Sequence, residues 1–267
     1  MMNVILRNLF RLLRAGAFGE QEQIEPLSPW KWRRLYLLAQ KHGISSYVDK
    51  GFERLEGQFF LQLPGDLPIG EKAQAEVKVQ TEEPKLTNPM LKRAMKKIVD
   101  EEAEGNDNTY TLQLLRKLTS ITTSILSSGI PLRQLIQLGL FLRSNSDKVD
   151  YQKLRSWIER LHMQRMAQLI GQLLVYLFHF SKEEVPFMSV KKEEEIDKII
   201  EELFQQPDDA SSEWLFEQGN DIFVHTSDSS AMFWQVRHSA RYFRYFPSES
   251  VTRFFSSFLR SLQNIEE

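Results

Sequence analysis

Apolar residues recur every three or four positions along most of the chain, which is the period of an amphipathic α-helix. Near the N-terminus this spacing predicts helices over residues 2–17 and 45–56. Between them, Ser28 followed by Pro29 is a typical helix start, and Gly43 is a typical helix stop. Residues 1–56 are therefore predicted to form an N-terminal helical part, in which the middle helix buries Trp32, Leu35, Leu38 and Ala39.

The pattern changes between residues 57 and 108. Strong charge and four prolines interrupt the helical spacing, at Pro64, Pro68, Pro84 and Pro89. Residues 73–80 alternate weakly between apolar and polar side chains, which indicates either a short strand or part of a helix. Another helix start is expected at Asn88 and Pro89. We predict a shortened, polar segment here, containing at most a small β remnant.

From residue 109 onward the helical spacing returns and persists. It predicts helices over residues 110–127, 131–144, 150–161 and 163–180, and further helices within 181–206, 230–246 and 248–262. The strands of an α/β sheet are missing from this pattern. We therefore expect a mainly α, bundle-like fold, in which a C-terminal helical part, 109–267, packs as one unit with residues 1–56.

The amino-acid composition excludes several kinds of functional site. The 267 residues carry a net charge of −2 and include no cysteine, which excludes disulfides, thiolate nucleophiles and cysteine-bound zinc. The five histidines form no closely spaced pair, so no metal site is predicted. No apolar run reaches the length of a membrane span, so we expect no span and, with cysteine absent, a cytoplasmic protein.

Several motifs occur in an order that resembles a known family. "SGIPLRQLIQLGLFL", residues 128–142, is followed by "PFM" at 186–188, "EQGN" at 217–220 and "RYFRYFPSES" at 241–250. The N-terminal "LLRAGAFGE" and "AQKHGISSYVDKGFERL" agree with the same family. Together they resemble a bacterial family of uncharacterised nucleotidyltransferase-like proteins.

The resemblance implies a Gly-Ser or Gly-Thr turn and a D-x-D pair on a strand, where both carboxylates face one side and bind magnesium. The sequence contains neither motif. Asp66 is followed two positions later by Pro68, and Glu195 and Asp197 lie on a predicted helix, where they diverge by about 200°. We therefore expect a degenerate, non-catalytic relative without cofactor. The alternative is an active nucleotidyltransferase with an unrecognised site, which would take magnesium and nucleotide.

Four arginines are the candidate binding residues, and no catalytic residue is predicted. Arg133 lies in an apolar helix, where it either binds a phosphate or carboxylate, or fixes helix packing. Arg237, Arg241 and Arg244 share one face of a predicted helix with aromatic residues between them. This pattern is typical of nucleic-acid surfaces and also of solvated helices whose arginines stack on their own aromatics. We expect a protein partner, with a helical nucleic-acid-binding protein as the alternative.

Overall fold

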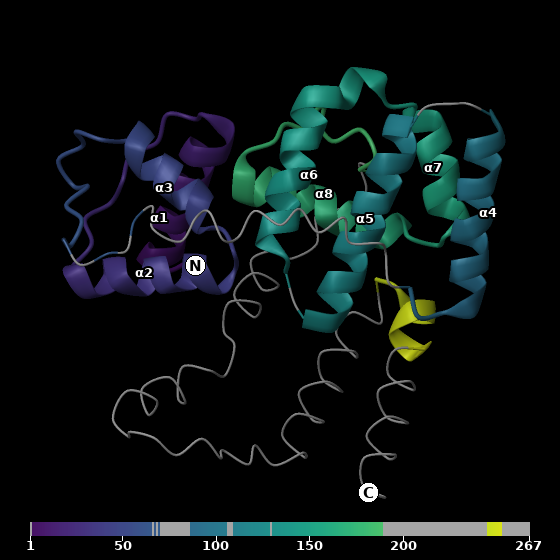
Figure 1. Ribbon diagram of the computed structural model, residues 1–267, viewed down its shortest axis with the longest axis horizontal. Coiled ribbons are helices and arrows are strands. Elements are labelled where there is room, and N and C mark those ends of the chain that lie inside the picture. Colours follow the sequence, from purple (N-terminus) through teal and green to yellow (C-terminus); the bar gives the residue numbers. More distant parts are fainter. Residues whose placement is uncertain are drawn as a thin grey trace, which may run out of the picture.

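The structure is a computed structural model that describes residues 2–65, 67, 69, 86–105, 109–128, 130–188 and 245–252. All regular elements in these ranges are helices, and none of the described residues belongs to a strand (Figure 1). The prediction of a mainly α, multi-helix fold is therefore confirmed. None of the described helices is both long and apolar enough to cross a membrane.

The N-terminal group consists of α1 (Val4–Leu13), the π-helical turn η1 (Arg14–Phe18), α2 (Pro29–Lys41) and α3 (Ser45–Arg54). The side chain of Asn3 accepts a hydrogen bond from the backbone N–H of Leu6 and caps the start of α1. Pro29 opens α2 as the sequence predicts, and Gly43 adopts a left-handed φ of 62° after its end. The bounds of these helices thus follow from local signals.

Two glycines allow α1 and α3 to approach at backbone distance. A Cβ atom built on Gly16 would lie 1.9 Å from the carbonyl oxygen of Tyr47. A Cβ atom on Gly51 would lie 2.4 Å from the carbonyl oxygen of Leu12. Because no side chain fits between the helices at these points, the packing of α3 against α1 and η1 depends on both glycines.

The second group consists of α4 (Pro89–Gly105), α5 (Thr109–Ser128), α6 (Leu132–Asn145), the short 3-10 turn η2 (Ser146–Lys148), α7 (Tyr151–Arg160) and α8 (Gln164–Phe178). Helix α5 contacts α4, α6, α7 and α8, so it is the centre of this group. Asp150 caps α7 by accepting a hydrogen bond of 2.9 Å from the backbone N–H of Lys153.

Residues 245–252 pack against the start of α4, although the two segments are far apart in sequence (Figure 1). The fully buried carboxylate of Glu249 accepts hydrogen bonds from the backbone N–H groups of Thr87 and Asn88. Asn88 in turn accepts a hydrogen bond from the backbone N–H of Met90. These contacts satisfy N–H groups at the beginning of α4, which has no preceding helical turn to pair with them.

The two groups of helices stand side by side and meet where η1 contacts α6 and α1 contacts α8 (Figure 1). Four phenylalanines form the apolar part of this contact. The ring of Phe18 lies 5.5 Å from that of Phe178 and 5.4 Å from that of Phe180, and Phe10 also packs on Phe178. Gly139 of α6 leaves room for these rings, because a Cβ there would lie 2.8 Å from Phe180. We call this contact region the junction.

Candidate functional site

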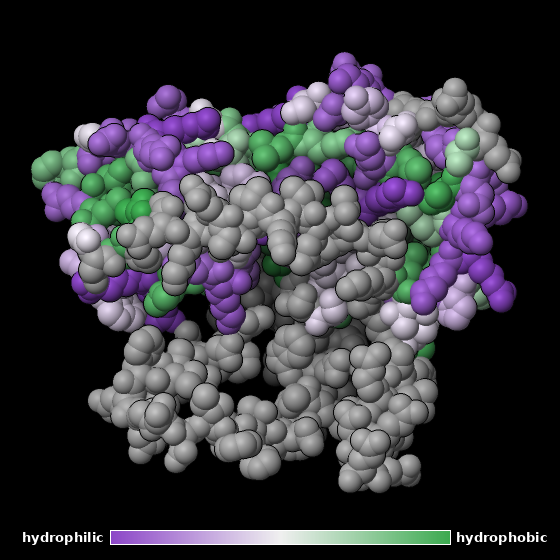
Figure 2. All heavy atoms as spheres, in the orientation of Figure 1, coloured by the Kyte–Doolittle hydropathy of each residue, from purple (hydrophilic) through white to green (hydrophobic). Residues whose placement is uncertain are grey.

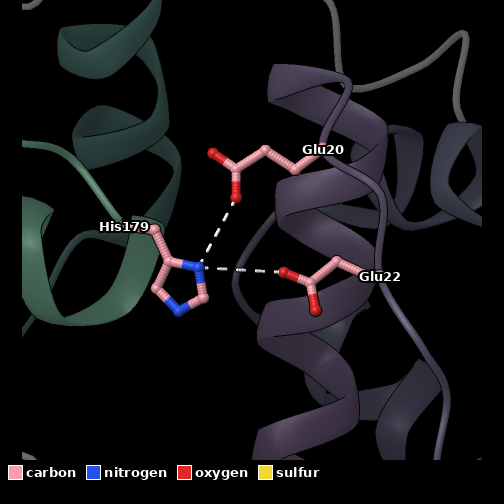
Figure 3. A group of neighbouring side chains, drawn as sticks. All are labelled: Glu20, Glu22 and His179. Carbon is pink, nitrogen blue, oxygen red and sulfur yellow. Dashed lines mark ion pairs between the residues drawn. The ribbon is translucent and has the colours of Figure 1, made fainter.

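Two carboxylates and one imidazole converge at the junction (Figure 3). Glu20 and Glu22 belong to the segment that follows η1, and His179 directly follows α8. The Nδ1 atom of His179 lies 3.6 Å from a carboxylate oxygen of Glu20 and 3.9 Å from one of Glu22. The side chains of Glu20 and Glu22 are 22% and 11% exposed, whereas that of His179 is 57% exposed.

The backbone turns that bring these residues together occur at the ends of two helices. Gly19 ends η1 with a φ of 75°, and the backbone N–H of Glu20 donates a hydrogen bond to the carbonyl oxygen of Arg14. His179 ends α8 with a φ of 54°, a left-handed conformation that is uncommon outside glycine. The imidazole of His179 faces the two carboxylates (Figure 3).

Two arginines neutralise the same carboxylates. Nε of Arg14 lies 2.5 Å from Glu22, and the guanidinium also donates a hydrogen bond of 2.9 Å to the carbonyl oxygen of Leu177. Nη2 of Arg143 lies 3.1 Å from Glu20. The Arg143 guanidinium is sandwiched near the rings of Phe18 and Phe180, and it also pairs with Glu184. The junction therefore combines aromatic packing with a network of ion pairs.

Donor atoms of Glu20, Glu22 and His179 all lie within 4.8 Å of one another, which is compatible with the spacing of metal ligands. A divalent cation at this point would have to share the carboxylates with the guanidiniums of Arg14 and Arg143. Because the arginines already supply the compensating positive charge, the arrangement fits an ion-pair junction better than a cation site. The sequence-based expectation of no metal site stays a prediction.

Arg133, the candidate in the apolar helix, is half-buried on α6. Its guanidinium faces the connection between α2 and α3, where a Cβ atom on Gly43 would lie 3.8 Å from Nη1. Burial raises the pKa of the nearby Tyr47 hydroxyl, and the positive charge of Arg133 opposes that rise. This position connects α6 with the N-terminal group, which is compatible with a packing role for Arg133.

The other predicted site residues lie outside the described part of the chain. They are Arg237, Arg241 and Arg244 of the predicted binding face, together with Asp66, Glu195 and Asp197 of the metal-pair argument. The structure thus places Arg133 alone among the four candidate arginines, and the proximity of Arg133 to the others stays untested.

The surface of α2 contains a second feature that sequence reasoning missed. Trp32, Leu35 and Ala39 are buried as expected, and Leu38 is half-buried. On the opposite side, however, Trp30 and Leu37 are each 56% exposed. In the space-filling view, hydrophobic and charged residues both reach the surface of the α1–α3 group (Figure 2).

Comparisons with known proteins add no assignment to these observations. No family model, no curated protein and no solved structure matches the chain. The class that the structure supports is therefore a mainly α protein with an ion-paired junction and with Trp30 and Leu37 exposed on α2.

Proposed function

We propose that the chain is a non-catalytic relative of the nucleotidyltransferase-like family and that it acts by binding a partner protein. The order of its helical motifs supports the relationship, and the absence of a D-x-D pair from the sequence supports the loss of nucleotidyl transfer. On this proposal the protein requires neither magnesium nor nucleotide.

The carboxylates at the junction support the same conclusion. Phosphoryl chemistry of this type needs carboxylates that are available to bind metal ions. Glu20 and Glu22 are instead held by Arg143 and Arg14 at hydrogen-bond distance. The pair between Glu20 and Arg143 joins the two groups of helices, and Arg14, which pairs with Glu22 inside the N-terminal group, reaches the second group through the carbonyl oxygen of Leu177.

The observation that carries the binding role is the exposure of Trp30 and Leu37 on α2. Both side chains are large and apolar, and neither is needed to fill the core, which Trp32 and Leu35 already fill. Exposed apolar groups that lie together on a surface mark interaction sites more often than isolated ones do. A binding protein explains this face, whereas nucleotidyl transfer does not require it.

The test is an assay for nucleotide chemistry on the full chain. We expect no pyrophosphate release with ATP, GTP, CTP or UTP in the presence of magnesium, and no magnesium-dependent heat of nucleotide binding in calorimetry. Circular dichroism of the same sample verifies that the protein is folded. Sustained turnover that Asp66→Ala abolishes would overturn the proposal. Turnover that Glu22→Gln abolishes would overturn it as well, because it would assign catalysis to the junction.

A further inference from the structure

The N-terminal half of α4 carries a group of exposed basic side chains, at Lys92, Arg93, Lys96 and Lys97. They stand in two rows, and the members of each row are four positions apart, so they are neighbours on the helix surface. On a helix of 3.6 residues per turn the two rows are about 100° apart. We call this surface the basic face.

The opposite side of α4 holds the basic face in place. Leu91, Met95 and Ile98 are buried in the core of the second group of helices. In Figure 1, α4 stands at the edge of this group, and Figure 2 shows that hydrophilic side chains cover the same edge. Because the core contacts use a separate set of residues, the basic face is presented to a ligand on a fixed helix.

Most of the charge on the basic face is not compensated within the described part of the chain. No described residue forms an ion pair or a hydrogen bond with the side chain of Lys92, Arg93 or Lys96. The Nζ atom of Lys97 lies 3.8 Å from a carboxylate oxygen of Glu101, in a pair whose side chains are 70% and 47% exposed. The basic face therefore keeps a net positive charge.

The acidic residues that follow on α4 do not cancel this charge. Glu101 pairs with Arg160 of α7 at 2.8 Å, and Glu102 pairs with Lys153 of α7 at 2.6 Å. Asp100 is exposed one turn beyond Lys96, and it marks the end of the basic face. Positive charge is thus concentrated on one part of the surface, although the chain as a whole carries a net charge of −2.

We propose that the basic face of α4 binds the phosphate backbone of a nucleic-acid duplex, independently of base sequence. Lysine and arginine side chains pair with backbone phosphates, and such contacts position a protein without reading bases. Because the four cations are spread over a convex helix surface, only an extended polyanion engages all of them at once. This function goes beyond the proposed binding of a partner protein and uses a different surface from that of Trp30 and Leu37.

Three other ligands fit the basic face less well. An anionic membrane would be attracted by the charge, but the apolar stripe of α4 that could insert into lipid is buried in the core. A protein partner would need an apolar centre of contact, and α4 offers the single exposed side chain of Met90. A single nucleic-acid strand would need aromatic platforms for its bases, and α4 contains no aromatic residue.

The experiment measures binding of the full chain to labelled DNA duplexes of about 20 base pairs by fluorescence anisotropy at several salt concentrations. Two duplexes of unrelated sequence are used. Vesicles of equal parts phosphatidylcholine and phosphatidylserine, and a poly-glutamate peptide, are the comparison probes. The test variant combines Lys92→Gln with Lys96→Gln. The matched control combines Lys31→Gln on α2 with Lys50→Gln on α3, which removes the same charge from other helices.

We expect both duplexes to bind with similar affinity. Since up to four phosphates are neutralised, the logarithm of the association constant should fall with the logarithm of salt concentration with a slope of about −3 to −4. The test variant should weaken binding at low salt at least about tenfold and reduce the size of this slope by about 2. The control variant should do neither, and circular dichroism verifies that both variants are folded.

Several results would overturn the inference. They are no binding of either duplex at low salt, or equal weakening by the test and control variants. Tighter binding to the vesicles than to DNA, lost in the test variant, would assign the basic face to a membrane. Binding of poly-glutamate as tight as that of DNA would assign it to an acidic protein. Trp30 and Leu37 are unchanged in every variant, so the proposed protein binding and the proposed loss of catalysis are tested independently.

Discussion

Replacement of Gly51 by alanine tests the close contact between α1 and α3. The added methyl group would lie 2.4 Å from the carbonyl oxygen of Leu12, about 1 Å closer than an ordinary van der Waals contact. Since the obstacle is backbone, α3 must move as a unit. Because the clash is with backbone, we place the cost of overpacking at about 2–3 kcal/mol, against a gain of about 1 kcal/mol from the higher helix propensity of alanine.

We therefore expect Gly51→Ala to lower the free energy of unfolding by about 1–2 kcal/mol and the Tm by about 2–8 °C. Urea unfolding followed by far-UV circular dichroism measures the change. Gly65→Ala is the control, because no atom lies within 4 Å of a Cβ at Gly65 and its φ is not left-handed. If Gly51→Ala unfolds at the same urea concentration as the parent, the helices do not meet at backbone distance and the reasoning is refuted.

Two further predictions concern ion pairs. Arg14→Met leaves the carboxylate of Glu22 without its closest partner, at a site where both side chains are about 10% exposed. We therefore expect the free energy of unfolding, measured in urea, to fall by about 3–5 kcal/mol. A decrease below about 1 kcal/mol would contradict this prediction. Hydrogen bonding to Arg7 lowers the pKa of Glu25 to about 2, so this pair stabilises the fold above pH 4.5 and the contribution is lost as the pH falls from 4.5 to 2. Because the Glu25 side chain is 31% exposed, we expect the pair to contribute at most about 1 kcal/mol to the free energy of unfolding. The stability of Arg7→Met should then fall less on acidification than that of the parent. Equal dependence of stability on pH in the two proteins would refute this prediction.

The sequence alone determined where most described helices begin and end, because these signals are local. Pro29 after Ser28, Asp150 before α7 and Asn88 before Pro89 each act on the adjacent helical turn. The period of apolar residues also determined the helical class, since a buried stripe on α2 needs only Trp32, Leu35 and Ala39 at the right spacing.

Only the tertiary structure decided which distant residues meet. Glu20 and Glu22 lie more than 150 positions before His179, and no local pattern relates segments so far apart. The sequence motif "GAFGE", residues 16–20, shows a turn after a helix but does not show what the turn faces. These three side chains converge because η1 packs on α6 and α1 packs on α8, and this packing is a property of the whole core.

The exposed face of α2 is another feature that the sequence alone did not reveal. The apolar spacing predicted the inner face, but Trp30 and Leu37 are as apolar as Trp32 and Leu35, so their own hydrophobicity does not reveal that they are exposed. The inner side of α2 is covered by α1 and α3, and the ring of Trp32, for example, packs against Phe52 of α3 at 5.9 Å. Exposure is decided by what covers a residue, and that depends on the fold as a whole.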